Sequence, residues 1–426
     1  MLNIKLIREN PEEIEKKLKT KQDDIQFKEI LELDSEVRNL QAQVEALKAK
    51  KNYVSKEIGE KIRKKEDVSN IKDQMGKLSD EIIKLDNQLK NSEKQREDLL
   101  SYLPNIPFNE IPVSDDPKDN VCIKEYKEKQ EFNFPFKNHL ELNEKLNLFD
   151  FKNSAKISGA NWPLYTSKGA KLEWALLNYM IDIHIKNGFN FILPPLLVKE
   201  DIMYGSGQLP KFKDQLFKIK DDDYNLHLIP TAEVVLNGLH YNEIIPKEKL
   251  PLKYVSYTPC FRREAGAAGK QERGLIRMHQ FNKVEMFCLT TPDTSNNMFD
   301  EMIRSAEEVL QGLELHYRNM LLVTKDMSFA SAKTIDIEVW LPGQDRYYEV
   351  SSVSNCTDFQ ARRSLIRSKE KEEKPELVHT LNGSGVATSR LMVALLENNQ
   401  KEDGTIIIPK ALQKYYHDDL IKPNSI

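Results

Sequence analysis

A stretch of 27 residues, FRREAGAAGKQERGLIRMHQFNKVEMF, concentrates side chains that could do chemistry between positions 261 and 287. It is predicted to be a β-hairpin whose two strands flank a loop with three glycines. Arg262 and Glu264 share a face of the first strand, because side chains alternate across a strand. By the same rule, one face of the second strand carries Arg277, His279, Phe281, Lys283 and Glu285. The hairpin therefore presents arginines, an aromatic ring and carboxylates together.

These residue types suit a ligand that combines phosphate, a flat ring and a small charged molecule. An arginine fork binds phosphate or carboxylate through two parallel hydrogen bonds, and an aromatic face can stack on a nucleobase. A buried carboxylate can hold an amine or a hydroxyl. The set fits a nucleoside triphosphate beside a small zwitterion, but a surface hairpin with cross-strand ion pairs has the same composition. The residues alone leave both interpretations open.

Three other segments carry oxygen ligands or an arginine. PTAE places a hydroxyl and a carboxylate two residues apart, at Thr231 and Glu233. YYEVSS brings Glu349 near Ser352, and these are the hard oxygen ligands that magnesium prefers. NGSGVATSR places small residues before Arg390 at a predicted helix start. Each segment also has an ordinary turn or strand interpretation.

Several common catalytic and cofactor motifs are missing from the sequence. It contains no GxxxxGK[ST] P-loop, no HExxH pair, and no GxSxG around Ser384. GSGQLP, from Gly205, lacks the last glycine of a dinucleotide fingerprint. Four scattered cysteines without a CxxC pair predict reduced thiols rather than a disulfide framework or a zinc site.

Composition and charge restrict the classes further. The chain has 426 residues and a formal net charge of -4, so any site for a polyanion must be a local patch. No apolar run approaches the ~20 residues needed to span a bilayer, and the first residues lack the apolar core of a secretory signal. We expect a cytoplasmic protein without a membrane partner.

The elements that would position the hairpin are expected within residues 121–426. Apolar periodicity predicts helices over 168–188, 294–313 and 384–399, and a hairpin over 333–352 that turns at Pro342-Gly343. Strands paired by tight turns, with helices segregated from them, indicate an antiparallel α+β domain. A linker with four prolines, residues 104–120, is predicted to precede this domain.

Residues 1–103 are predicted to form a separate helical domain. Apolar residues recur in heptad steps from Leu33 to Ile58 and again from Ile71 to Leu89, with the polar stretch RKKEDVSN between them. We expect a long antiparallel hairpin over about 27–100 with its turn near 64–69.

The distal end of this hairpin is basic. Residues 48–65 hold eight basic and two acidic side chains. This run is either the solvated surface of a coiled coil, as most charge runs are, or a tip that meets a phosphate backbone. The residues that would form such a tip are Lys50, Lys51, Lys61, Arg63, Lys64 and Lys65.

The ordered motifs resemble a known family. FRRE…RMHQF resembles motif 2 of the class II aminoacyl-tRNA synthetases, GFNFILPP is similar to motif 1, and GSGVATSR is similar to motif 3. The helical arm, with PTAE, GSGQLPKF and EVSSVSNCTDFQARR, narrows the resemblance to the bacterial-type seryl-tRNA synthetases over essentially the whole chain. It implies an α+β fold, in which an antiparallel coiled-coil arm precedes an antiparallel β-sheet domain flanked by helices.

The resemblance also implies an activity and its partners. L-Serine would be activated by ATP with Mg²⁺, without zinc, and transferred from seryl-adenylate to tRNA(Ser), and also to tRNA(Sec). The family is a homodimer, in which the arm of one subunit grips the long variable arm of the tRNA and serves the catalytic site of the other. No DNA is implied as a partner.

The resemblance implies roles for matching residues. Serine would be bound by Thr231, Ala232, Glu233, Arg262, Glu285 and Ser384. ATP would be bound by Arg262, Arg263, Glu264, Met278, Phe281, Glu349, Val350, Ser351, Ser352 and Arg390. Arg262 and Arg390 would be catalytic, and Glu349 and Ser352 would hold magnesium. Lys270, Gln271 and Arg273 in the loop receive no separate role.

Two rival functions stay open at this point. A synthetase-like ligase that loads a carrier protein would tend to lack the helical arm, which this chain has. A non-catalytic tRNA-binding paralogue would be signalled by losses among the family's site residues. Arg262, Glu285, Glu349 and Arg390 are all present.

Overall fold

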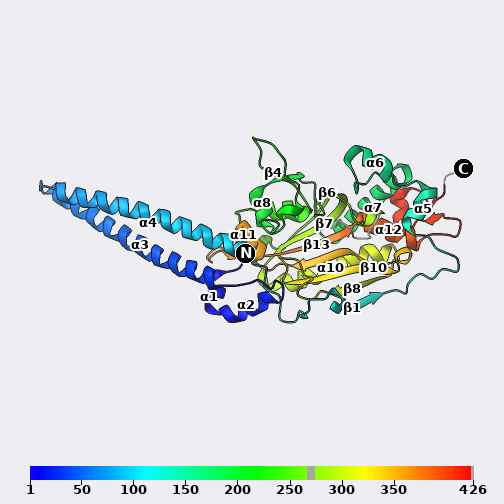
Figure 1. The fold of residues 1–426 in the computed structure, drawn as a ribbon, viewed down its shortest axis with the longest axis horizontal. Helices are drawn as coiled ribbons and strands as arrows, with labels where there is room; N and C mark the ends of the chain where they lie inside the picture. Colours follow the sequence, from blue (N-terminus) through cyan, green and yellow to red (C-terminus); the bar gives the residue numbers. More distant parts are fainter. Residues whose placement is uncertain (266–273, 424–426) are drawn as a thin grey trace. The chain divides into compact units, whose positions relative to one another are not determined.

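A computed structural model describes residues 1–265 and 274–423 (Figure 1). The chain divides into two compact units, Met1–Leu103 and Pro104–Ile426. The first unit is helical, and the second holds all of the described β-strands. No helix in the described part of the chain is long and apolar enough to cross a membrane.

The first unit is built around two long helices. They are α3 (Lys28–Arg63) and α4 (Ser69–Ser101), and two short helices, α1 (Ile4–Glu9) and α2 (Pro11–Lys19), precede them. The heptad pattern accounts for the pairing, since Val37, Val44, Leu78 and Ile82 are buried in the seam between α3 and α4.

A buried carboxylate ties three of these helices together. Asp34 of α3 is 1% exposed and accepts hydrogen bonds from Arg8 of α1 at 2.8 Å and from Arg96 of α4 at 2.9 Å. Burial would raise the pKa of the Asp34 carboxyl, but the two arginines prevail and hold it below its usual value. The base of the arm is therefore fixed by charge as well as by its apolar seam.

The second unit is organised by an eight-stranded sheet in the order β1-β8-β9-β10-β13-β7-β6-β2. In that order the strands are Val121–Tyr126, Tyr317–Leu321, Lys333–Leu341, Arg346–Asn355, His379–Ala387, Gln280–Thr290, Leu252–Phe261 and Asn190–Ile192. Neighbouring strands are antiparallel except at one edge, where β2 runs parallel to β6. The predicted α+β class, with a helical arm and an antiparallel sheet, is confirmed.

Shorter strands form small separate sheets around this one. They are β3 (Leu197–Lys199) with β4 (Leu226–Leu228), β5 (Ile244–Pro246) with β11 (Arg367–Lys369) and β12 (Glu376–Leu377), and β14 (Ile406–Ile407) with β15 (Leu420–Ile421).

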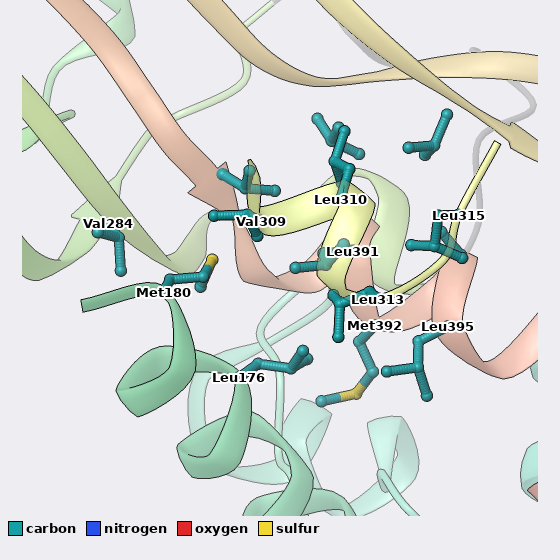
Figure 2. Close-up of a cluster of buried hydrophobic side chains, with 14 of the residues drawn as sticks. Leu176, Met180, Val284, Val309, Leu310, Leu313, Leu315, Leu391, Met392 and Leu395 are labelled. Atoms are coloured by element: carbon teal, nitrogen blue, oxygen red, sulfur yellow. The ribbon is translucent and has the colours of Figure 1, made fainter. Parts of the chain in front are cut away.

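Three long helices cover the large sheet and form the main core. They are α7 (Ser167–Lys186), α10 (Ser295–Gly312) and α12 (Thr388–Asn398). Figure 2 shows side chains of all three gathered in one cluster, among them Leu176, Met180, Val309, Leu310, Leu391, Met392 and Leu395. The other helices are α5 (His139–Leu146), α6 (Phe151–Ser158), α8 (Glu200–Gly205), α9 (Ala232–Gly238), α11 (Phe359–Ser364) and α13 (Lys410–Tyr416).

The proline-rich segment after residue 103 lies within the second unit. Asn105 is 4% exposed, and its side-chain amide donates to the carbonyls of Ala330 and Cys356, each at 2.9 Å. This end of the segment is therefore anchored by buried hydrogen bonds.

The strand alternation predicted for residues 277–285 is wrong at its start. β7 begins at Gln280, and a short 3₁₀ turn spans Gly274–Ile276. Gly274 has a φ of 73°, a conformation that glycine adopts without strain and that interrupts a strand. Phe281, Lys283 and Glu285 share a face as predicted, whereas Arg277 and His279 lie before the strand. The strand predicted for Arg262 and Glu264 is also wrong, because β6 ends at Phe261 and Glu264 has a φ of 48°.

The helix predicted over 384–399 is also wrong at its start. Residues 379–387 form β13, a central strand between β10 and β7, and α12 begins only at Thr388. The small residues before Arg390 indicated the start of a helix. The packing explains them, because a Cβ at Gly385 would lie 2.4 Å from the buried His184 ring.

Candidate active site

Two adjoining clefts lie over β6, β7, β10 and β13. The smaller has a volume of about 220 Å³ and the larger about 600 Å³. Both are lined by Arg262, Glu264, Arg277, Lys283, Glu349 and Ser384. The shared wall therefore carries three cations and two carboxylates, contributed by β7 and β10 and by the segments that follow β6 and precede β7.

The smaller cleft combines an aromatic face with two arginines. The Arg262 guanidinium lies over the Phe281 ring, 5.1 Å from its centroid. Arg390, in the first turn of α12, donates to the Glu349 carbonyl at 2.7 Å and to its carboxylate at 3.3 Å. Met278 and Val350 complete the predicted residues of this cleft. Such a wall can receive a flat ring and a chain of phosphates.

The larger cleft contains a half-buried carboxylate at the start of α9. Glu233 accepts hydrogen bonds from the side chains of Gln360 at 2.6 Å and Asn382 at 3.1 Å. Burial, and next the negative charge of Glu285, raise the pKa of Glu233 to about 7. A carboxylate in this setting is a strong partner for a substrate ammonium group.

A second polar group in the larger cleft joins β7 to the start of α9. Thr231 caps α9 and accepts a hydrogen bond from the Lys283 ammonium at 2.8 Å. The same ammonium pairs with Glu285 at 2.5 Å. Ser384, the register partner of Glu285 on β13, lines both clefts.

Most, but not all, of the predicted site residues line these clefts. Three of them, Ala232, Arg263 and Ser351, line neither cleft. Ala232 is fully buried in the core and Arg263 is exposed. The Ser351 hydroxyl donates to the Ser384 carbonyl at 2.5 Å. His279 also lies outside, where its ring packs on Trp162 and its Nδ1 donates to the Arg262 carbonyl at 3.1 Å. Lys270, Gln271 and Arg273 lie outside the described residues.

Sequence reasoning missed three residues that shape the larger cleft. Lys283 was placed on the correct face of β7 but given no role. Gln360 and Asn382 come from α11 and β13, more than 120 residues from Glu233 in the chain. No local pattern could associate them with Glu233, because their contact depends on the tertiary fold.

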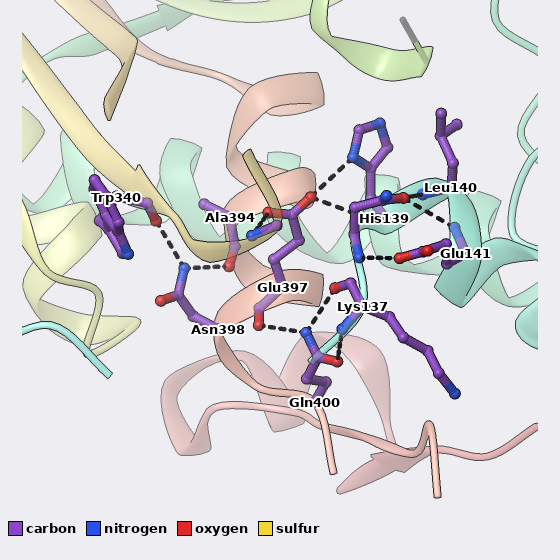
Figure 3. A network of polar contacts seen from close by, with 11 residues as sticks. Lys137, His139, Leu140, Glu141, Trp340, Ala394, Glu397, Asn398 and Gln400 are labelled. Atoms are coloured by element: carbon purple, nitrogen blue, oxygen red, sulfur yellow. Dashed lines mark hydrogen bonds and ion pairs between the residues drawn. The ribbon is translucent and has the colours of Figure 1, made fainter. Parts of the chain in front are cut away.

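A buried polar network positions the segment that enters β7. Figure 3 shows the Glu397 carboxylate, on α12, directed at the ring and main chain of His139 on α5. Its other oxygen accepts from the Gly343 amide at 2.9 Å. A Cβ added to Gly274 would lie 2.3 Å from His139 Nε2, so the network packs directly against the 3₁₀ turn before Met278. Arg390, two helical turns before Glu397 on α12, donates to the Ile276 carbonyl at 3.5 Å, so this helix contacts the segment directly as well as through His139.

The six basic residues predicted for the arm tip lie in the second half of α3 (Lys28–Arg63) and in the turn that follows. Lys50, Arg63, Lys64 and Lys65 are exposed, while Lys51 and Lys61 are half-buried. Lys61 is partly neutralised by Glu57, 3.2 Å away on the same helix. The tip therefore offers four fully exposed cations.

Comparisons with known proteins agree with both units. Residues 1–107 match the family model "Seryl-tRNA synthetase N-terminal domain", and residues 217–399 match "tRNA synthetase class II core domain (G, H, P, S and T)". The serine--tRNA ligase of Chlamydia abortus is 51% identical over 97% of this chain and 98% of its own length. The ligase of Chlamydia trachomatis serovar L2 is 48% identical over 100% of both chains.

Solved structures give the same result. The crystal structure of seryl-tRNA synthetase from Pyrococcus horikoshii complexed with ATP has a TM-score of 0.92 and 38% identity, and covers 100% of both chains. The cytoplasmic serine-tRNA ligase from Naegleria fowleri in complex with AMP has a TM-score of 0.87 and 28% identity over 100% of this chain and 99% of that one. The chain belongs to the seryl-tRNA synthetase family, the serine–tRNA ligases among the class II aminoacyl-tRNA synthetases.

Proposed function

We propose that the two clefts hold ATP and L-serine side by side, so that seryl-adenylate forms at their shared wall. The observation that carries this assignment is the position of Arg262, which lines both clefts. A single guanidinium can there contact the serine carboxylate and the ATP α-phosphate, the two groups that react.

Each cleft supplies the remaining contacts. In the smaller cleft Phe281 stacks on adenine, Met278 and Val350 lie beside the nucleotide, and Arg390 meets the γ-phosphate. In the larger cleft Thr231 and Glu233 hold the serine ammonium end, and Glu285 and Ser384 meet the serine hydroxyl. Glu264 faces the nucleotide from the shared wall, where Arg277 holds its carboxylate at 2.7 Å.

The chemistry needs placed charge rather than a base. A serine carboxylate oxygen bonds to the α-phosphorus as the bond to the β-phosphate oxygen breaks, and diphosphate leaves. The nucleophile is already ionised, and no histidine is among the described residues that line either cleft. A terminal ribose hydroxyl of the tRNA then attacks the acyl carbon, and AMP leaves. Positioning and charge neutralisation by Arg262 and Arg390 lower the first barrier.

The site also fits a divalent cation. Glu349 and Ser352 line the larger cleft, and Asp336, the cross-strand partner of Ser352, has a buried Oδ1 without a hydrogen-bond partner. Burial, and next the charge of Glu349, raise the pKa of Asp336 well above its usual value. Hard oxygen donors crowded in this way suit Mg²⁺, which Glu349 and Ser352 would hold together with phosphate oxygens. When bound, it would neutralise phosphate charge.

The partners follow from the same proposal. The arm contacts tRNA(Ser), with tRNA(Sec) as an additional acceptor, and two copies of the chain form a homodimer in the cytoplasm. The rival ligase that loads a carrier protein is not favoured, because the N-terminal family match spans the whole arm.

Serine-dependent exchange between ATP and labelled diphosphate is the experiment that tests this function. We expect exchange with serine and none above background with the other standard amino acids, because only a hydroxyl-bearing side chain of this size satisfies Glu285 and Ser384. Exchange that depends on a different amino acid would refute the proposal, and absence of exchange with every amino acid would favour a non-catalytic paralogue.

The acidity of Glu233 predicts the pH dependence of this reaction. Below a pKa of about 7 the carboxyl is protonated and no longer pairs with the serine ammonium. We expect kcat/KM for serine to fall about tenfold per pH unit below that value, since kcat/KM reports groups of the free enzyme. Exchange measured from pH 8.5 to 5.5 checks this. Glu233→Gln, which cannot ionise, should be slower at every pH but should not show this fall in kcat/KM below pH 7. A wild-type kcat/KM that does not change with pH would contradict the role of Glu233 in binding the serine ammonium.

A further inference from the structure

We propose that Lys283 is the positioning residue of the serine subsite and sets its selectivity for the hydroxyl. This inference rests on the proposed function, because it assigns Lys283 a task within the serine cleft. Lys283 lies between Phe281 and Glu285 on the face of β7 that lines both clefts.

The Lys283 ammonium joins two walls of the larger cleft. Its Nζ lies 2.8 Å from Thr231 Oγ1, at the start of α9, and 2.5 Å from Glu285 Oε2 on its own strand. The side chains of Lys283 and Glu285 are 8% and 2% exposed. A buried ion pair with an added hydrogen bond holds its members in one geometry, and it is costly to break on one side only.

This contact also fixes the place of α9 against β7. Thr231 Oγ1 accepts from the Glu233 amide at 3.3 Å as well as from Lys283. Lys283 therefore holds the cap of the helix whose first turn presents Glu233. The group assigned to the serine amine and the group assigned to its hydroxyl are thus connected through one side chain.

The charge of Lys283 is needed because the cleft is acidic. Glu285 is buried and Glu233 is half-buried. Burial and then the charge of Glu285 raise the pKa of Glu233, while the charges of Lys283 and Arg262 lower it. Two carboxylates in this cleft with a single substrate ammonium would leave one negative charge uncompensated. Lys283 compensates Glu285, so that the serine ammonium is left for Glu233.

The selectivity follows from the orientation of Glu285. With Oε2 held by Lys283, we assign Oε1 as the acceptor for the serine hydroxyl. A site built to bond a hydroxyl rejects the analogue that lacks it only if its polar groups cannot turn to other partners. Without Lys283, the Glu285 carboxylate loses its fixed direction, and the advantage of serine over alanine should shrink.

The test measures binding of two analogues that differ only in the hydroxyl. The sulfamoyl analogues of seryl-adenylate and alanyl-adenylate share the adenosine, so both should bind tightly enough for calorimetry. We expect the wild-type chain to prefer the seryl analogue, and Lys283→Met to reduce the ratio of the two Kd values at least about tenfold, the loss expected for a buried charge-assisted contact. The Kd for AMP should change less than about twofold.

Matched variants separate this role from a general effect on folding. Lys253, on the adjacent strand β6, pairs with Glu301 and the Asn187 carbonyl and lines neither cleft, so Lys253→Met should leave the ratio unchanged. Lys283→Arg keeps the charge and should retain more of the preference than Lys283→Met. If Lys283→Met does not bind AMP, Lys283→Gln, which can donate to Thr231 without a charge, is measured in its place and should show the same loss.

The outcomes distinguish this inference from the proposed function. A wild-type chain without preference for the seryl analogue would overturn both. A clear wild-type preference that survives in Lys283→Met, or in Lys283→Gln, would overturn the role of Lys283 alone. Equal loss of affinity for the two analogues in Lys283→Met would also overturn the role of Lys283. It would show that Lys283 supports the structure of the cleft but does not contribute to selectivity for the hydroxyl.

Discussion

Replacing Arg262 by alanine should abolish adenylate formation, with serine-dependent exchange reduced by about 10³-fold or more. Arg262 lines both clefts, and its guanidinium is held in place by the Pro230 carbonyl at 3.3 Å and by the Phe281 ring. Loss of one pre-organised donor from a developing charge costs about 10²–10³ in rate. Arg262 would serve the carboxylate and the phosphate at once, so its loss should exceed that range.

The control is an arginine of the same sheet outside the clefts. Arg318 pairs with Glu338 at 2.7 Å between β8 and β9 and lines neither cleft, so Arg318→Ala should keep exchange within about twofold of wild type. Both variants are measured at saturating ATP and serine, together with binding of adenosine, which lacks the α-phosphate, as a check on the cleft. Near-normal exchange in Arg262→Ala would contradict its assignment to the reacting groups.

The strand pattern correctly predicted which side chains of β7 share a face, but it failed for the segment that precedes β7. Alternation placed Phe281, Lys283 and Glu285 on one face because these residues lie in a regular strand. It failed before Gln280, because Gly274 turns the chain and packs against His139, a residue 135 positions away. Arg277 reaches both clefts from an irregular segment that no periodicity describes.

Long-range packing explains the other failures. The helix predicted from residue 384 begins too early, because the sequence does not show that the glycines of β13 are explained by His184 and Val353, side chains of other elements that occupy the space beside them. Glu233 was found from its local motif, but its raised pKa depends on Glu285 and on burial, and its hydrogen bonds come from Gln360 and Asn382. Residue types and spacing could therefore predict which side chains gather at the clefts, whereas their electrostatics required the fold.

Shortening the arm should separate the two half-reactions. We expect a chain that lacks residues 45–85, closed by a short glycine–serine turn, to keep serine-dependent exchange within about twofold of wild type and to lose at least about 10² in kcat/KM for tRNA(Ser) charging. The cut retains Asp34 with its partners Arg8 and Arg96, and the contact between Ser92 and Glu36 at 3.0 Å, so the base of the arm keeps its ion pairs. It removes all eight basic residues between positions 48 and 65.

A milder variant tests whether the basic residues of the arm act by contacting phosphates of the tRNA. Lys64→Ala with Lys65→Ala removes two exposed cations without shortening a helix, since both residues follow the end of α3. If they contact phosphates, the slope of log kcat/KM for tRNA against log salt should become shallower by about one for each contact, while exchange stays unchanged. Parallel loss of charging and exchange in the shortened chain would mean that the arm supports the catalytic fold. An unchanged salt slope in the double variant would instead place the phosphate contacts elsewhere on the arm, because counterion release registers only the cations that the tRNA actually neutralises.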